Sequence, residues 1–314
     1  MKGVILFFLV FISVYKVNTQ KGHFAPAMGE YMGDCFIHEE KAPKQIKNYV
    51  FLGHIYQNDF RINPQIEQLD FGQFDQIWLG GDLLIETTKD QSNLDYLDCL
   101  FDLSNPKTKW ALGNHDVRNG NVKWITEKTK RGSFYTSHSD GITYFVLNAN
   151  GLKINDLDES FVKSQYRLLK TVCDTITNSS HFIILSHHCP WQDVDSIITT
   201  GAHVDASKFA FNVRPIQNFY DAIYKPLLEK VQDKGVDVLF ISGDFGQYRN
   251  GYDYKSNSGV RFLGSGILPE ADDPKYDFNK RFFRYNLPDS ILVFEHDIVN
   301  QKLQWDFRLI NDYY

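Results

Sequence analysis

The sequence is poor in cysteine, and its four cysteines show none of the spacings of a thiolate metal site. Cys35, Cys99, Cys173 and Cys189 include no Cys-x-x-Cys pair, which argues against a zinc site built from cysteines. Three disulfide pairings are open to such a set, and free buried thiols are an equal alternative. A chain of 314 residues can bury a sufficient core without a disulfide, so both alternatives stand.

The sequence also lacks an excess of charge of one sign. Lys and Arg number 33, Asp and Glu number 39, and the two signs are mixed along the chain, which gives a formal net charge of −6. A protein that binds duplex nucleic acid normally has a basic face, and binding to a membrane surface normally needs a polybasic stretch. We therefore expect no nucleic acid as a partner. A Gly-x-Ser-x-Gly motif is absent too, and no pair of carboxylates stands out, which argues against serine esterases and glycoside hydrolases.

No apolar run reaches the roughly 20 residues that span a bilayer. One shorter run, Gly3–Tyr15, follows Lys2 and precedes a polar stretch. This pattern is typical of a signal peptide, which we place at residues 1–20, and it predicts a secreted or periplasmic mature protein without a transmembrane segment. A buried first strand or helix is the alternative. Because no linker or repeat is visible further on, we interpret residues 21–47 as an N-terminal lead-in and 48–314 as one domain.

Short apolar runs rich in Val, Ile and aromatic residues recur along the chain, and each ends in a glycine-rich or polar turn. Continuous runs of this kind are expected for strands that are buried on both faces. The predicted strands are Tyr49–Leu52, Gln76–Leu79, Trp110–Leu112, Ile142–Leu147, Phe182–Leu185, Val236–Ile241 and Val260–Leu263.

Helical patterns separate these runs, and a strand-to-helix alternation predicts an α/β layer arrangement. The C-terminal segment Ser290–Ile310 alternates differently and predicts an antiparallel hairpin. Together the patterns predict an α/β fold in which a two-sheet β-sandwich is flanked by helices, in the layer order α/β/β/α. The predicted helices are Ser92–Leu103, Val122–Lys130, Asp158–Ile176 and Pro215–Lys234.

Four predicted strands lead directly into residues that ligate metals. A Gly-Asp after a strand is more often a turn than a ligand, so one such junction is weak on its own. Four of them are much more informative, because glycine allows close approach of the backbone and Asp, Asn and His together suit Mn, Fe, Zn or Mg. The junctions are Gly80-Gly81-Asp82, Gly113-Asn114-His115-Asp116, Ser186-His187-His188 and Ser242-Gly243-Asp244.

Three of these elements resemble the motifs of the calcineurin-like metallophosphoesterase superfamily. They are Gly81-Asp82, the tetrapeptide from Gly113 to Asp116, and His188-x-Pro190, in the order that the family has them. The resemblance implies a β-sandwich that holds two divalent metal ions, here Mn, Fe or Zn. It also implies a small phosphorylated substrate, hydrolysed by a metal-activated water.

The resemblance assigns a role to each matched position. Asp82 would bridge the two metal ions, and Asn114 and His188 would bind the second ion, with His187 as the alternative to His188. His115 would assist the leaving oxygen, and Asp116 would orient its imidazole.

The chain departs from the family in its first and last motifs. Where the family has Asp-x-His, this sequence has His54-Ile55-Tyr56, and where the family has Gly-His-x-His it has Gly243-Asp244-Phe245-Gly246. His54 and Asp244 preserve the ability to ligate, so we predict both as ligands, and Tyr56 and Glu86 are further candidates for the first ion. The first metal site is therefore weak, differently ligated or absent.

Substrate contacts are the least constrained part of the prediction. Arg118 and Asn119 follow the Gly-Asn-His-Asp element directly, and we predict that they bind the substrate phosphate. The insertion between His188 and the strand at Val236 offers further cationic and aromatic side chains. Monoesters and diesters both remain open, and a metal- or phosphate-binding protein with little turnover is the alternative function.

Overall fold

A computed structural model describes residues 44–152, 159–188, 224–245, 251–267 and 290–313. The chain divides into two units, Met1–Cys35 and Phe36–Tyr314, and every structural statement below concerns the second. The predicted signal peptide lies outside the described residues, as does most of the predicted lead-in. Among the helices that the structure describes, none is long and apolar enough to cross a membrane.

The first sheet has five strands in the order β11-β10-β1-β2-β3. Its three N-terminal strands run parallel to one another, and the C-terminal hairpin pairs antiparallel to β1. The predicted hairpin is thus confirmed. The strands are β1 (Ile46–Leu52), β2 (Gln76–Leu79), β3 (Thr108–Trp110), β10 (Ser290–Asp297) and β11 (Lys302–Leu309).

The second sheet has six strands in the order β4-β5-β6-β7-β9-β8. The four central strands are parallel, and an antiparallel strand closes each edge. The strands are β4 (Tyr135–Ser139), β5 (Ile142–Val146), β6 (His181–Ser186), β7 (Asp237–Ser242), β8 (Gly251–Lys255) and β9 (Arg261–Ser265).

Side chains along the central strands alternate between the space between the sheets and the helical layers. In β1, Tyr49 and Phe51 pack between the two sheets, whereas Val50 and Leu52 belong to the apolar cluster beneath the helices of the first sheet. This period of two, with apolar residues on both faces, explains why the strand is a continuous apolar run.

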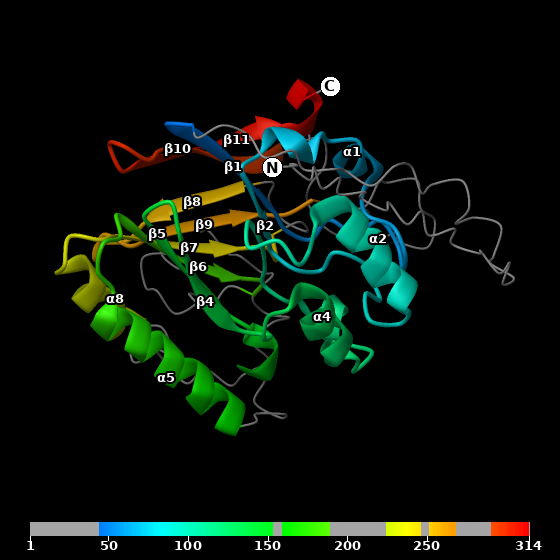
Figure 1. Cartoon of the computed structure of the whole chain (residues 1–314), viewed down its shortest axis with the longest axis horizontal. Helices are drawn as coiled ribbons and strands as arrows, with labels where there is room; N and C mark the ends of the chain where they lie inside the picture. The colour runs from blue at the N-terminus through cyan, green and yellow to red at the C-terminus, as the bar shows by residue number, and fades with distance from the viewer. Residues whose placement is uncertain (1–43, 153–158, 189–223, 246–250, 268–289, 314) are drawn as a thin grey trace, which may run out of the picture. The chain divides into compact units, whose positions relative to one another are not determined.

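Helices cover the outer face of each sheet. Buried residues of α2 and α4 pack with the first sheet, and those of α5 and α8 pack with the second, where Figure 1 shows both helices along one face. The predicted α/β fold with two sheets and flanking helices is confirmed. The helices are α1 (Pro64–Glu67), α2 (Gln91–Phe101), α3 (Asn114–Val117), α4 (Val122–Thr129), α5 (Glu159–Thr175) and α8 (Lys225–Gln232), with 3₁₀ turns at Phe71–Gln73, Ala149–Leu152 and Ile310–Tyr313.

The structure differs from the predicted elements mainly at strands that contain polar residues. The third strand comprises Thr108–Trp110 rather than Trp110–Leu112, because its buried Lys109 donates a hydrogen bond of 2.6 Å to Oε1 of Gln76 and so enters the sheet without an unpaired amine. The edge strands β4 and β8 were not predicted, since their exposed sides are polar. The first part of the last predicted helix, 215–223, lies outside the described residues.

The structure shows the state of two of the four cysteines. Cys99 is disulfide-bonded, whereas Cys173 is a buried free thiol. The sequence left disulfides and free buried thiols as alternatives, and both therefore occur in the chain.

A buried histidine pair connects the two sheets at the opposite end of the strands from the junctions described above. His181 opens β6, and its ring lies edge-on to that of His296 in β10, with 6.2 Å between the ring centroids. Burial lowers the pKa of His181 from 6.5 to about 4, despite the opposing effect of Asp237 at 3.9 Å. Folding therefore excludes a proton that the unfolded chain binds.

We expect this histidine to make the fold acid-sensitive. Above about pH 6.5 it is neutral in both states and has no effect, whereas between about pH 6.5 and 4 only the unfolded chain takes the proton, so the free energy of unfolding falls by up to about 3 kcal/mol. Denaturant titrations of the wild type and His181→Gln across this range test the expectation. As the pH falls, the free energy of unfolding of the wild type should fall relative to that of the variant. A difference that is constant with pH would contradict the assignment.

Candidate metal centre

Glycines bring the carboxyl ends of strands from both sheets into backbone contact. Gly53 follows β1, Gly80 follows β2, and Gly243 follows β7. A Cβ atom on Gly243 would lie 2.1 Å from the carbonyl oxygen of Gly80, and one on Gly53 would lie 2.4 Å from the Cα of Gly243. No side chain fits in such a contact. The polar residues that follow these glycines therefore meet at one edge of the sandwich.

His187 lies at the centre of these polar residues. It follows β6 and is fully buried, and its Nδ1 lies 2.7 Å from the carbonyl oxygen of Gly80. Because a carbonyl only accepts, Nδ1 carries a hydrogen and the lone pair of the neutral ring is on Nε2. That Nε2 makes no well-formed hydrogen bond, yet it lies 3.2 Å from Oδ2 of Asp82 and 4.0 Å from Oδ1 of Asp244. A buried imidazole nitrogen that faces two carboxylates can hold either a proton or a metal ion.

The carboxylates and the imidazoles set one another's protonation. Burial alone would lower the pKa of His187, but Asp82 and Asp244 raise it to about 10. Burial alone would raise the pKa of Asp82, but His187 and His115 hold it far below its usual range. Both carboxylates are therefore charged, and a divalent cation can replace the proton on His187.

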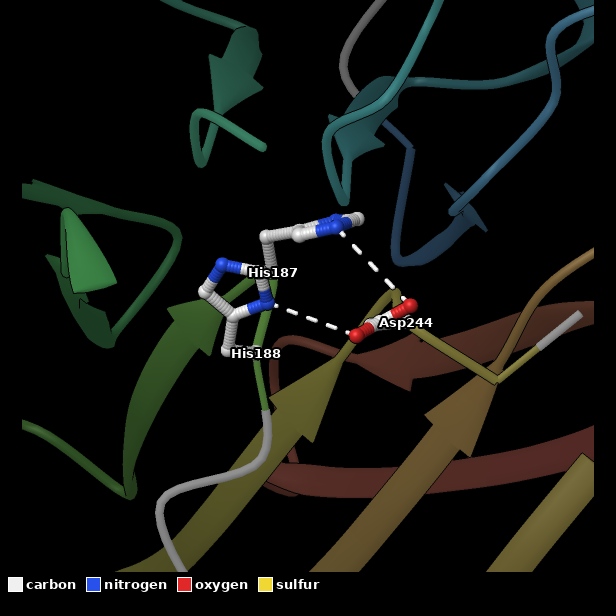
Figure 2. A group of neighbouring side chains, drawn as sticks. All are labelled: His187, His188 and Asp244. Atoms are coloured by element: carbon white, nitrogen blue, oxygen red, sulfur yellow. Dashed lines mark hydrogen bonds and ion pairs between the residues drawn. The ribbon is translucent and has the colours of Figure 1, made fainter. Parts of the chain in front are cut away.

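Three residues can supply ligand atoms to a single cation. His187, His188 and Asp244, called the His-His-Asp group below, offer one atom each, and these atoms all lie within 4.8 Å of one another (Figure 2). Nδ1 of His188 is 3.3 Å from Oδ2 of Asp244. The chain bends after β6, so these consecutive histidines both turn towards the carboxylate, with 4.7 Å between their ring centroids. Two imidazoles, one carboxylate and the neighbouring Asp82 form a donor set that fits Zn, Mn or Fe.

Two of the predicted ligands have a backbone conformation that is unusual for residues with a side chain. His54 has φ = 52° and Asp82 has φ = 54°, both in the left-handed region. Each such residue costs on the order of 1 kcal/mol, and residues of this kind are concentrated at functional sites. The conformation joins two neighbouring loops of the first sheet, since N–H of His54, after β1, donates a 2.9 Å hydrogen bond to the carbonyl of Gly81, after β2.

The structure places His54 and Tyr56 beside the site but outside the His-His-Asp group. Nδ1 of His54 lies 3.2 Å from the carbonyl oxygen of Ile267, so Nδ1 donates and Nε2 is the atom available to a ligand. Burial lowers the pKa of His54, which favours the neutral ring that metals bind. The ring of Tyr56 lies between those of His54 and His115, with centroid distances of 4.5 and 5.0 Å. Tyr56 thus packs against two site histidines.

His115 has a fixed place at the rim of the centre. Its backbone N–H donates a 2.8 Å hydrogen bond to Oδ1 of Asp82, and its Nε2 lies 3.8 Å from Oδ2 of the same carboxylate. Its Nδ1 donates to the carbonyl of Ile85 at 2.9 Å, and Nη2 of Arg118 lies 3.0 Å from its Nε2. The side chain is held close to the metal ligands without being one of the His-His-Asp group.

Asp116 does not orient His115 as predicted. Its carboxylate is fully buried and accepts hydrogen bonds from the backbone N–H groups of Asp82, Leu83 and Gly113, and from the side chains of Thr87 and Trp110. Five donors occupy both oxygens, so none is left for the imidazole. The carbonyl of Ile85, rather than Asp116, accepts the hydrogen bond from Nδ1 of His115. The carboxylate of Asp116 instead connects the loop after β2 to the loop after β3.

The remaining predicted site residues differ in their burial and in the groups that they contact. Asn114 is half-buried as the first residue of α3, next to the backbone bond that joins His115 to Asp82. Arg118 and Asn119 are exposed, and of the two only Arg118 has a contact with a site residue among those described. Glu86 pairs with Lys89 at 2.6 Å, as a solvated carboxylate would. The insertion after His188 lies outside the described residues up to position 223.

Sequence reasoning missed the central position of His187 and the role of Ile85. The consecutive histidines after β6 were the available signal for the first, and the sequence prediction treated them as alternatives although both contribute. A backbone carbonyl carries no residue-type signal, so nothing in the sequence could identify Ile85 as the partner of His115.

Comparison of the whole chain with known proteins gives no assignment. No family model matches it, and a search of curated proteins returns no match. Membership of the metallophosphoesterase superfamily therefore stays a prediction from the short motifs, and the functional proposal depends on the site geometry.

Proposed function

We propose that the protein is a metal-dependent phosphoesterase that hydrolyses a small phosphate ester. The observation that carries the proposal is the convergence of the His-His-Asp group with Asp82, from the ends of β6, β7 and β2, on one buried point. A divalent ion at this point would neutralise phosphate charge and lower the pKa of a bound water. The resemblance of the strand-end motifs to metallophosphoesterases supports the same reaction class, and the α/β fold with two sheets is consistent with the fold that the resemblance implies.

The chain's own residues supply the remaining functions in this proposal. His115, held by Ile85 beside Asp82, is placed to give a proton to the leaving oxygen. Arg118 is placed to bind the non-bridging phosphate oxygens, since its guanidinium lies within 3.0 Å of the same imidazole. The buried carboxylate of Asp116 keeps these loops in register.

We also propose that the protein works outside the cytoplasm. The apolar N-terminal run supports export, and the disulfide of Cys99 supports an oxidising compartment, because such bonds are rare where thiols are kept reduced.

Hydrolysis assays with defined metals test the proposed reaction. The full chain, expressed through a secretory route, should hydrolyse an aryl phosphomonoester or phosphodiester when supplied with Mn²⁺, Fe²⁺ or Zn²⁺. A chelator should abolish the activity, and added metal should restore it. Failure to hydrolyse either ester with any of these ions would refute the enzyme assignment.

One observation favours a second candidate, a metal- or phosphate-binding protein with little turnover. The first motif is altered, and His54 bonds to the carbonyl of Ile267 and packs against Tyr56, outside the His-His-Asp group. A centre that holds one ion firmly and lacks a second would bind phosphate better than it cleaves an ester. Calorimetric titration with Mn²⁺ and then inorganic phosphate separates the candidates, since binding without hydrolysis supports the second.

A further inference from the structure

The contact between Arg118 and His115 fixes the hydrogen positions on the imidazole. A guanidinium only donates, so Nε2 of His115 accepts from Nη2 of Arg118 at 3.0 Å. A carbonyl only accepts, so Nδ1 of the same ring carries a hydrogen and donates to Ile85. The guanidinium thus covers the ring nitrogen that lies 3.8 Å from Oδ2 of Asp82.

The imidazole in this contact is held on several sides, whereas the arginine is not. The ring of Tyr56 packs against that of His115, and Ile85, whose carbonyl accepts from its Nδ1, donates its own N–H to the carbonyl of Asn58 at 3.0 Å. Arg118 directly follows the last residue of α3, and its side chain is exposed. Among the described residues its guanidinium forms no ion pair with a carboxylate. Of the two partners, the cation is therefore the one that can leave.

Such a cation is suited to a negatively charged ligand, whose oxygens bind a guanidinium more strongly than an imidazole nitrogen does. A phosphomonoester carries a charge of about −1.5 to −2 at pH 7 and three acceptor oxygens. A phosphodiester carries a single charge and two non-bridging oxygens. If one oxygen faces the metal ligands, a monoester keeps two for the paired N–H groups of a guanidinium, whereas a diester keeps one.

We infer that the substrates are phosphomonoesters and that Arg118 selects them. This inference rests on the proposed phosphoesterase function. In the free protein its guanidinium covers Nε2 of His115. The two free oxygens of a bound monoester draw the guanidinium away from the imidazole, so Nε2 can take up a proton from solvent and give it to the leaving oxygen of the ester. A diester holds the guanidinium less well and leaves His115 covered for more of the time.

Kinetics on a matched pair of substrates tests the inference. The wild type should have a higher kcat/KM for an aryl phosphomonoester than for the methyl diester with the same aryl leaving group. Arg118→Ala should lower kcat/KM for the monoester by about 100-fold and for the diester by about 10-fold, so that the preference falls about tenfold. Arg118→Lys should restore part of the preference, because a point charge replaces a bidentate donor. Arg167→Ala, which removes an exposed arginine from α5, is the matched control and should change neither value.

A binding measurement keeps the inference separate from the proposed function. In calorimetry on the Mn²⁺-loaded protein, inorganic phosphate should bind more tightly than dimethyl phosphate, and Arg118→Ala should remove most of that difference. If Arg118→Ala lowered kcat/KM equally for both esters and affinity equally for both ligands, Arg118 would have no selective role, while the proposed hydrolase function would stand. Arg118-dependent binding of phosphate without any hydrolysis would instead refute the proposed reaction and keep the selectivity. A variant that is faster than wild type on both esters would also overturn the inference, because Arg118 would then only obstruct the site.

Discussion

Asp244→Ala should release the metal ion and, with it, nearly all activity. The substitution removes the only carboxylate of the His-His-Asp group and leaves the two imidazoles of His187 and His188 as its remaining donors. We expect metal affinity to fall by about 100-fold or more, since even partners that merely orient a ligand contribute 10- to 100-fold. Elemental analysis after dialysis against a weak chelator measures the metal, and turnover is measured on the same samples.

Two further variants make this result interpretable. Asp244→Asn keeps the size and one oxygen but removes the charge, so it should retain some metal at high concentrations of added ion. Asp237→Ala removes a carboxylate from the start of the same strand, where 86 % of the side chain is exposed, and should leave metal content and turnover unchanged. Unchanged metal content in Asp244→Ala would show that the ion, if one binds, lies elsewhere.

The sequence predicted the positions of the ligating residues better than their partners. Glycine followed by Asp82 or Asp244 after an apolar strand specifies where the chain turns, and the close contact of Gly80 with Gly243 explains why both glycines are needed. These are local signals, because strand, turn and ligand are adjacent in the chain. The convergence itself follows from parallel strands, whose carboxyl ends meet at one edge.

The sequence could not predict which groups those side chains contact. Asp116 was assigned to His115 because the two are adjacent, but its hydrogen bonds run to Asp82 and Leu83, more than 30 residues away. Similarly, the resemblance assigned a single ligand to the His-x-Pro motif, which was His188, with His187 only as its alternative. The bend after β6 turns both rings to the same side, and a bend outside a known turn motif has no residue-type signal.

The remaining misassignments concern polar residues in buried or edge strands. The predicted strand began at Trp110 and left out Lys109. In the structure the amine of Lys109 donates to Gln76 and lies 4.1 Å from the ring centroid of Tyr144. Burying an amine is possible only where such partners exist, and they come from β2 and β5. Only a three-dimensional arrangement supplies them.

His115→Ala should lower turnover by about 10²–10⁴-fold, the usual contribution of a general acid, and should leave metal content nearly intact. The imidazole is not in the His-His-Asp group. In addition, the bond that anchors Asp82 at this point comes from the backbone N–H of residue 115, so it survives any substitution except proline. Metal analysis and turnover on the same samples therefore separate a proton donor from a ligand, and a parallel loss of both would refute the proposed role.

Dependence on the leaving group distinguishes a proton donor from a residue that only shapes the site. An alkyl phosphate has a poor leaving group that needs a proton as its bond breaks, whereas an activated aryl phosphate leaves readily as an anion. His115→Ala should therefore reduce turnover of the alkyl ester by a factor at least ten times larger, as a rough estimate, than it reduces turnover of the aryl ester. His115→Asn, whose side-chain amide can still donate to Ile85, should behave like the alanine variant. If the asparagine variant recovered activity on the alkyl ester, the contact with Ile85 alone would matter, and His115 would be a positioning residue.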